Sequence, residues 1–271
     1  MDEGRPHPRV IAHRGSSEDV AEHTLAAYER AIADGADGLE CDVRLTADGH
    51  LVCVHDRRVE RTSDGRGVVS TLELAELTAL DFGNWKRGWD FDDEAEWPDR
   101  TLTGILTLER LLGTVLDAGR PLELAIETKH PTRYAGLVER TLVDLLDRFG
   151  LAHPRRGQPS LVRVMSFSQL SLRRVRRLAP SLGTVLLLDR LPLRFRDGAL
   201  PVGVPTAGPG IHVVRRQPRV VRAFRTRGHE VHVWTVNEPD DVRMCLDLGV
   251  DAIITDRPAA VLRQVEEVVD A

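Results

Sequence analysis

The chain has 271 residues, of which 42% are apolar and 29% charged, so it has the size of one α/β barrel and the composition of an ordinary globular domain. Its net charge of −5 argues against a nucleic-acid partner or an anionic membrane surface, and no run of about 18 apolar residues predicts a membrane span. The polar segment Met1–Arg9 lacks the apolar core of a signal peptide. The sequence has three cysteines that follow no metal-ligand spacing, Cys41, Cys53 and Cys245, and they favour a reducing cytoplasm.

Strand-like and helix-like segments alternate along almost the whole chain, which predicts parallel strands joined by helical crossovers. Strands are expected at Val10–His13, Gly38–Val43, Leu51–His55, Leu122–Glu127, Leu161–Ser166, Thr184–Leu188, Gly210–Val213, Val231–Val236 and Ala252–Asp256. Helices are expected at Thr24–Asp34, Leu72–Leu77, Leu108–Ala118, Tyr134–Phe149, Ser168–Leu178, Pro218–Arg227 and Asp240–Leu248.

The second and third predicted strands are too close together for a parallel crossover, which takes a dozen or more residues. Asp48-Gly49 between them is a strong signal for a two-residue hairpin turn. Leu51–His55 should therefore return antiparallel as an extra strand, and the other strands should form a TIM-type (β/α)8 barrel. We expect one catalytic domain over residues 1–271, with a small insertion at about 82–104.

The predicted hairpin also places side chains. If Asp48 and Gly49 are the two central turn residues, Asp42 lies opposite His55, and opposed residues share a face of the strand pair. Glu40 lies on that face as well, because side chains alternate along a strand. Glu40, Asp42 and His55 should then converge, although a longer turn would shift this register.

The insertion is the least regular region of the sequence. Phe82–Gly104 contains Trp85, Trp89 and Trp97, together with six acidic residues. A loop of this length in a compact barrel is often functional. Its aromatic residues could equally serve only to anchor it to the barrel, and the sequence leaves both interpretations open.

Polar residues follow several strands, at the end where barrels hold their catalytic groups. His13 and Arg14 come after the first strand, where a histidine can exchange protons and an arginine suits phosphate oxygens. Most isolated histidines are structural. His55 would provide a second histidine at this mouth, and Trp234 could pack on a glycerol chain or belong to the core.

Carboxylates are the stronger signal. Glu40 and Asp42 share a strand face and repel each other unless a cation or another partner lies between them. Oxygen ligands of this kind suit hard cations such as Mg²⁺ or Ca²⁺, although two ordinary solvated carboxylates remain an alternative. Glu127 and Lys129 end another strand, adding a third carboxylate and a phosphate-seeking cation, and a surface ion pair fits poorly there.

Together these pieces resemble the glycerophosphodiester phosphodiesterase family over nearly the whole chain. The resemblance is carried by His13-Arg14-Gly15, Gly35-Ala36-Asp37-Gly38-Leu39-Glu40-Cys41-Asp42-Val43, Thr46-Ala47-Asp48-Gly49, Val52-Cys53-Val54-His55-Asp56, Glu127 with Lys129, Ser166-Phe167, Trp234-Thr235-Val236-Asn237, Gly249-Val250-Asp251 and Thr255-Asp256-Arg257-Pro258.

The resemblance implies a role for each candidate residue. It implies that Glu40, Asp42 and Glu127 are ligands of one divalent cation, Mg²⁺ or Ca²⁺ with Mn²⁺ as a further candidate. It implies that His13 and His55 form the acid–base pair. It also implies that Arg14 and Lys129 hold the phosphate of a small glycerophosphodiester and that Trp234 faces its glycerol. One departure stands before the first helix, where the family usually has Pro-Glu-Asn-Thr and this chain has Ala21-Glu22-His23-Thr24. His23 is a candidate for a substrate contact or, as we favour, for an alternative loop hydrogen bond.

The expected reaction is metal-dependent hydrolysis of a glycerophosphodiester to glycerol phosphate and an alcohol. The sequence leaves open whether water or a substrate hydroxyl attacks phosphorus, and which histidine is the acid. A rival interpretation is a lysophospholipase D-type phosphodiesterase that acts on lysolipids through an apolar entrance at the insertion. A catalytically silent phosphate-binding protein is the rival from another class, and it would be expected to lack one of these carboxylates or histidines.

Overall fold

The computed structural model describes residues 7–86, 99–129, 136–154 and 160–269. Trp89 and Trp97 of the predicted insertion lie outside these residues. No helix within the described ranges is both long and apolar enough to cross a membrane.

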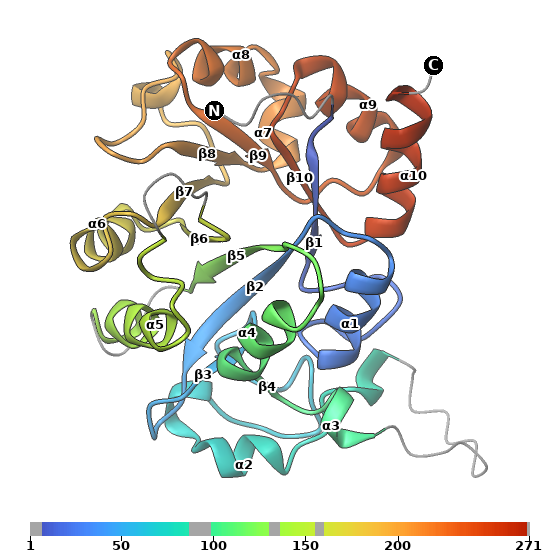
Figure 1. The fold of residues 1–271 in the computed structure, drawn as a ribbon, viewed down its shortest axis with the longest axis vertical. Coiled ribbons are helices and arrows are strands. Elements are labelled where there is room, and N and C mark those ends of the chain that lie inside the picture. The colour runs from blue at the N-terminus through green and yellow to red at the C-terminus, as the bar shows by residue number, and fades with distance from the viewer. Residues whose placement is uncertain (1–6, 87–98, 130–135, 155–159, 270–271) are drawn as a thin grey trace.

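A closed barrel of parallel strands forms the centre of the molecule (Figure 1). Neighbouring strands pair in parallel around the ring, and the ring closes where β1 pairs with both β2 and β10. Its strands are β1 (Arg9–His13), β2 (Gly38–Leu45), β5 (Glu123–Thr128), β6 (Val162–Ser166), β7 (Gly183–Leu188), β8 (Thr206–Pro209), β9 (Glu230–Val233) and β10 (Ala252–Thr255). The predicted TIM-type barrel is thereby confirmed.

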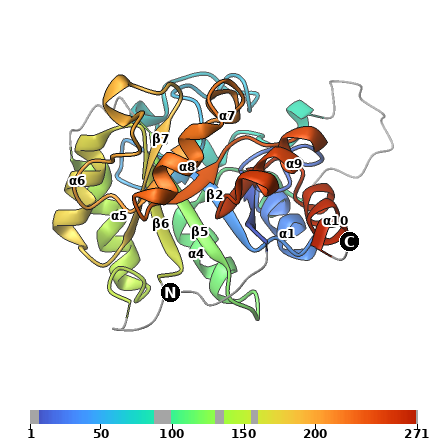
Figure 2. The ribbon, with the colours of Figure 1, turned by 90° about the horizontal axis from the view of Figure 1, so that it is seen from above.

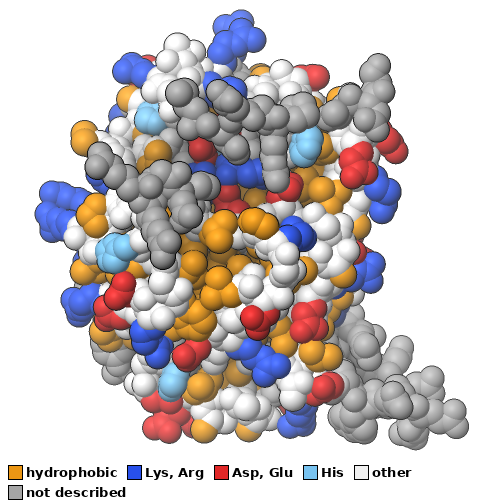
Figure 3. Space-filling model, viewed as in Figure 1, with side chains coloured by type: hydrophobic (Ala, Val, Ile, Leu, Met, Phe, Trp, Pro, Cys, Tyr) orange, Lys and Arg blue, Asp and Glu red, His pale blue; other side chains and the backbone are white. Residues whose placement is uncertain are grey.

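Helices surround this barrel, with α5 and α6 on one side and α1, α9 and α10 on the other in both views (Figures 1 and 2). The helices are α1 (Leu25–Ala33), α2 (Leu74–Thr78), α3 (Arg100–Thr103), α4 (Leu108–Leu116), α5 (Leu137–Arg148), α6 (Gln169–Leu178), α7 (Ile211–Arg216), α8 (Arg219–Thr226), α9 (Pro239–Leu248) and α10 (Pro258–Val269), with short 3₁₀ turns η1 (Val69–Thr71), η2 (Asn84–Lys86) and η3 (Leu193–Phe195). Acidic and basic side chains are interspersed over the described surface in Figure 3, and apolar ones gather in a hollow near its middle.

The extra strand predicted after β2 is present, but its predicted register was wrong. β3 (Leu51–Cys53) runs antiparallel to β2 and pairs in turn with β4 (Leu106–Thr107). Val43 lies opposite Cys53, so Asp42 lies opposite Val54 and not opposite His55. The cause is a three-residue turn in which Gly49 takes a φ of +90°, the left-handed conformation typical of longer hairpin loops.

One predicted strand was also wrong. Gly210–Val213 is the start of α7, and the barrel strand at this point is Thr206–Pro209. The short apolar run Ile211-His212-Val213-Val214 looks like a strand, yet Val213 and Val214 are buried on a helix. A short apolar run cannot be assigned from its periodicity alone. The Gly and Pro in the true strand weakened the signal there.

Apolar residues form an inner and an outer core. Inside the barrel, Ile11, Ala125, Met165, Val185 and Ile254 pack together in one layer. Between strands and helices lie two larger clusters, one under α1, α4, α5 and α6 and the other under α7 to α10. The inner layer separates two polar ends of the barrel interior, so chemistry at one mouth is insulated from the other.

The N-terminal mouth of the barrel holds a network of ion pairs. Arg163 Nε lies 3.0 Å from Glu123 Oε1, and Arg163 Nη2 lies 3.0 Å from Glu230 Oε2. Arg9 bridges the same two glutamates and contacts the ring of His232, which is fully buried. This end of a barrel usually serves stability, and the paired charges suit that role.

We expect Arg163→Met to destabilise the fold by about 2–4 kcal/mol, because it leaves Glu123, whose side chain is only 10% exposed, with less compensation. This loss of stability is smaller than that expected on breaking a fully buried ion pair, because the Glu230 side chain is 41% exposed. Urea denaturation measures the change, and folded Arg163→Met should keep its activity. Arg148→Met, which removes an exposed contact with Glu109 at 3.6 Å, is the matched control and should cost less than about 0.5 kcal/mol. Equal stability of the two variants would contradict a stabilising network.

Candidate active site

Three acidic side chains meet at the C-terminal mouth of the barrel. Glu40 and Asp42 lie on β2, and Glu127 lies on β5 directly beside Asp42. Strand alternation directs these side chains into the barrel, whereas Cys41 and Val43 point into the outer core. All three carboxylates are buried, and each offers an oxygen within 4.8 Å of the others. The two strands thus create a compact cluster of acidic groups.

Burial and mutual repulsion separate the pKa values of these three groups. Burial and the charge of Asp42 raise the pKa of Glu40 well above its usual range, and they raise the pKa of Glu127 to about 8. Burial opposes ionisation of Asp42 as well, but a hydrogen bond from His23 and the charges of Arg14 and Lys129 hold its pKa well below the usual value. Asp42 is therefore the member of the cluster that ionises most readily.

Two cations contact the cluster from different elements. Lys129, just after β5, has its Nζ 3.2 Å from Asp42 Oδ1 and 2.9 Å from Glu127 Oε1. Arg14, just after β1, has its Nε 3.0 Å from Asp42 Oδ2. The structure thus brings the predicted carboxylates and both predicted phosphate-binding cations to one place.

The turn after β1 fixes the position of Arg14. Its backbone N–H donates to the main-chain oxygen of Glu40 at 3.1 Å, and Arg14 itself has a φ of 60°. Gly15 follows with a φ of +84°, and a Cβ there would lie 2.5 Å from the carbonyl carbon of Ala27. Only glycine permits this approach of the turn to α1.

His13 lies at the end of β1, directly beside Glu40 on β2. Its Nδ1 is 2.6 Å from Asp256 Oδ1, and its Nε2 is 3.9 Å from Glu40 Oε2. Asp256 follows β10 and also accepts hydrogen bonds from Ser17 and Asn237. A carboxylate on Nδ1 fixes the orientation of the ring, leaving Nε2 directed at the acidic cluster.

His55 makes the same kind of pair. Its Nδ1 is 2.7 Å from Asp56 Oδ1. The charges of Asp42, Arg14 and Lys129 all act on His55, and burial, the largest influence, lowers the pKa of its imidazole. The charge of Asp42 thus reaches His55 although the predicted register was wrong. The chain turns after Cys53, so strand alternation no longer governs where His55 points.

Trp234 lies just after β9 at the same mouth, and it is half-buried. Its Nε1 donates to the main-chain oxygen of Gly208 at 2.7 Å. The rings of Phe167 and His212 meet it edge to face at centroid distances of 5.5 and 6.3 Å. The Phe167 side chain is 44% exposed, so this aromatic wall presents apolar surface toward solvent.

His23 is buried between α1 and β2. Its Nδ1 is 2.8 Å from the hydroxyl of Tyr28, and its Nε2 is 3.0 Å from Asp42 Oδ2. Both ring nitrogens are engaged, which favours the hydrogen-bonding role over a substrate contact. The partner, however, is a carboxylate of the site rather than the loop itself.

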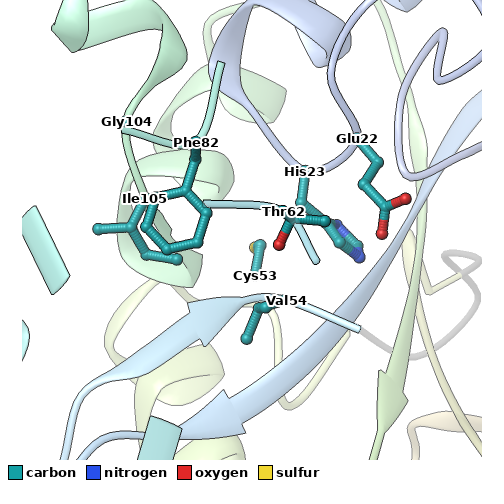
Figure 4. A pocket seen from close by; sticks show the side chains of 8 residues that line it. All are labelled: Glu22, His23, Cys53, Val54, Thr62, Phe82, Gly104 and Ile105. Atoms are coloured by element: carbon teal, nitrogen blue, oxygen red, sulfur yellow. The ribbon is translucent and has the colours of Figure 1, made fainter. Parts of the chain in front are cut away.

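A small cavity lies beside His23 (Figure 4). It is lined by Glu22, His23, Cys53, Val54, Thr62, Phe82, Gly104 and Ile105. In Figure 4 the ring of His23 lies between Glu22 and Thr62. Phe82 and Gly104 are the two ends of the predicted insertion and Ile105 directly follows it, so the insertion borders the site.

Sequence reasoning overlooked several contacts of the site, among them Asp256, Glu22, Tyr28 and Arg61. Asp256 carried a usable signal, because it follows a barrel strand at the same mouth as His13. Glu22 and Arg61 carried none, because each lies on an irregular segment. Their contact, two hydrogen bonds of 2.8 and 2.7 Å, joins positions far apart in the chain.

The acidic cluster fits a divalent cation. Its donors are three carboxylates, the type of ligand preferred by Mg²⁺, Ca²⁺ and Mn²⁺. Each offers an oxygen within 4.8 Å of the others, and buried Asp42 Oδ1 meets Lys129 Nζ at 3.2 Å as an ion pair but accepts no hydrogen bond among the described residues. Burial and the charge of Asp42 raise the pKa of Glu127 to about 8, and a cation bound here would favour its ionised form.

Comparisons with known proteins agree with this geometry. Residues 13–260 match the model of the glycerophosphoryl diester phosphodiesterase family. A Mycobacterium tuberculosis protein named "Probable glycerophosphodiester phosphodiesterase 1" is 46% identical over 252 residues, covering 93% of this chain and 90% of its own. The glycerophosphodiester phosphodiesterase of Bacillus subtilis is 34% identical over 253 residues, covering 92% of this chain and 83% of its own.

A solved structure is similar over nearly the whole fold. The phosphodiesterase of Oleispira antarctica, in complex with the product sn-glycerol-3-phosphate, has a TM-score of 0.80 and 25% identity, covering 96% of this chain and 97% of its own. The chain therefore belongs to the glycerophosphoryl diester phosphodiesterase family, a family of hydrolytic enzymes.

Proposed function

We propose that this enzyme hydrolyses glycerophosphodiesters to glycerol phosphate and an alcohol, with a divalent cation and two histidines. The observation that carries this proposal is the arrangement of His13 and His55 around the acidic cluster, each oriented by a carboxylate on Nδ1. The related phosphodiesterase with sn-glycerol-3-phosphate as its product supports the proposed substrate. We also propose one catalytic domain and, from three buried free thiols, a cytoplasmic location.

Glu40, Asp42 and Glu127 would hold the cation. When bound, the cation supplies positive charge that polarises the phosphoryl oxygens and stabilises the charge that develops on them. Arg14 and Lys129, which lie against the same carboxylates, would hold the remaining phosphate oxygens. Mg²⁺, Ca²⁺ and Mn²⁺ are all compatible with this donor set.

The two histidines would move the protons of the reaction. With Nδ1 held by Asp256 or Asp56, each ring has Nε2 available for exchange. One histidine takes the proton of the attacking water or substrate hydroxyl, and the other gives a proton to the leaving alkoxide. Each such transfer typically contributes about 10²–10⁴ in rate.

An assay of a substrate panel tests the proposed function. Glycerophosphocholine, glycerophosphoethanolamine, glycerophosphoglycerol and lysophosphatidylcholine are supplied with Mg²⁺, Ca²⁺ or Mn²⁺ in turn. We expect turnover of the three small diesters and release of glycerol phosphate. Turnover of lysophosphatidylcholine alone would overturn the proposed substrate in favour of lysophospholipase D activity.

Metal binding should depend on pH through Glu127. Because the pKa of Glu127 is raised to about 8 without metal, cation binding below that pH must displace its proton. The apparent affinity should rise about tenfold per pH unit from pH 6 to 7 for each proton released. In the metal-free protein the same group makes the fold less stable as pH rises toward 8. Calorimetry in two buffers of different ionisation enthalpy counts the protons, and a count of zero would contradict this prediction.

Trp234 should contribute to recognition of glycerol. We expect wild type to discriminate weakly among choline, ethanolamine and glycerol head groups, but strongly against a simple aryl phosphodiester. Trp234→Ala should reduce the second discrimination by on the order of 1–3 kcal/mol. The measurement is the ratio of kcat/KM for the two diesters. Leu193→Ala, at a side chain 77% exposed, is the control, and an unchanged ratio in Trp234→Ala would remove Trp234 from the glycerol pocket.

A further inference from the structure

Arg61 contacts two carboxylates at once. It lies in the segment that follows β3, and its Nε donates to Asp56 Oδ2 at 2.5 Å. Its Nη1 and Nη2 donate to the two oxygens of Glu22 at 2.8 and 2.7 Å. The guanidinium therefore holds Glu22 as a two-pronged fork and still reaches Asp56, which a lysine ammonium could not reproduce.

Each of these carboxylates also binds a residue of the candidate active site. Asp56 accepts at 2.7 Å from Nδ1 of His55, and Glu22 accepts at 3.0 Å from Nη1 of Arg14. A continuous chain of polar contacts thus runs from His55 to Arg14, with Arg61 at its centre. The chain joins the segment after β3 to the loop before α1.

The beginning of the insertion packs against the same guanidinium. Arg61 Cζ lies 5.8 Å from the ring centroid of Trp85 on η2. The neighbouring Lys86 donates to main-chain oxygens of Ser17 and Val20 in the loop before α1. Arg61 is therefore held on one side by an aromatic ring and on the other by two carboxylates.

If Arg61 had a purely structural role, its replacement would change the stability of the fold only slightly. Its side chain is 43% exposed, and an isolated exposed ion pair contributes little to stability. Its contact with Glu22, whose side chain is only 11% exposed, is bidentate and belongs to a network. Loss of Arg61 should therefore alter the positions of His55 and Arg14 more than the stability of the fold.

We propose that Arg61 is a positioning residue, which keeps the His55–Asp56 pair and the Arg14 side chain aligned on the phosphate. This inference rests on the proposed two-histidine hydrolysis. It assigns to Arg61 two separable contributions. The fork sets geometry, and the positive charge balances Asp56 and thereby sets the protonation of His55.

Two substitutions separate these contributions. Arg61→Met removes both, so kcat/KM should fall about 10–100-fold. The limb of its pH profile that belongs to His55 should move up by about half a pH unit, since Asp56 then attracts the proton more strongly. Arg61→Lys keeps the charge and loses the fork, so its rate should fall while that limb stays at the wild-type pH.

The control is Arg58→Met, which removes a nearby arginine whose Nε donates to Glu60 at 2.9 Å and which reaches no residue of the site. It should match wild type in rate and in pH profile. The limb position does not depend on how much enzyme is folded, so it tests the proposal even if Arg61→Met melts lower. A wild-type rate and pH profile in Arg61→Met would overturn the inference.

His55→Asn distinguishes this failure from failure of the proposed function. If His55→Asn keeps full activity, the proposed two-histidine catalysis is wrong, and so is the proposed role of Arg61. If His55→Asn is inactive while Arg61→Met behaves as wild type, only the positioning role is wrong.

Discussion

Replacing His13 or His55 with alanine is expected to lower kcat by about 10²–10⁴-fold while leaving the fold intact. Each imidazole lies at the barrel mouth with its Nδ1 bound to a carboxylate, outside the apolar layers that stabilise the barrel. The loss should therefore be chemical. Steady-state kinetics measures it, and thermal unfolding should show a Tm within a few degrees of wild type.

His50→Ala is the matched control for these variants. His50 directly follows the hairpin turn, its side chain is 50% exposed, and its Nε2 is 3.7 Å from Asp48 Oδ2. It should turn over at the wild-type rate. If either His13→Ala or His55→Ala also turns over normally, that histidine is neither the acid nor the base.

Removal of the divalent cation is expected to abolish hydrolysis. Without the cation, burial and the charge of Asp42 raise the pKa of Glu40 and Glu127. The reaction then also lacks the divalent charge that would polarise the phosphoryl oxygens. Glu127→Gln should weaken cation binding by at least the 10–100-fold that is typical for loss of an outer-shell partner. Titration calorimetry with Mg²⁺, Ca²⁺ and Mn²⁺ measures the affinity.

The control for the carboxylate variants is Glu109→Gln. Glu109 lies on α4 with its side chain 55% exposed, and it contacts Arg148 at 3.6 Å, away from the barrel mouth. Cation affinity and rate should both be unchanged there. Full activity in excess chelator would contradict the assignment of Glu40, Asp42 and Glu127 as a metal site.

The barrel could be predicted from the sequence because its strands and helices alternate with clear apolar runs. The carboxylates could be predicted because strand ends in a barrel share one mouth, so Glu40, Asp42 and Glu127 had to be neighbours. The strand β8 was not predicted because Gly208 and Pro209 weaken its strand pattern. The helix after it begins with an apolar run that looks like a strand.

The detailed geometry could not be predicted, for reasons that differ between residues. The register of the hairpin depended on whether two or three residues form its turn, and the left-handed Gly49 decided it. The contacts of His23 with Tyr28 and Asp42 depend on the path of an irregular loop. The same holds for Arg61 with Glu22, since nothing in local periodicity brings two irregular segments together.

The most direct test of the account is ³¹P NMR of the reaction with glycerophosphocholine, run with Mg²⁺, Ca²⁺ or Mn²⁺ and again with excess chelator. The account predicts that glycerol phosphate appears with at least one cation and that no product appears with chelator. Phosphocholine as the product, or glycerol phosphate formed at the same rate in chelator, would contradict it.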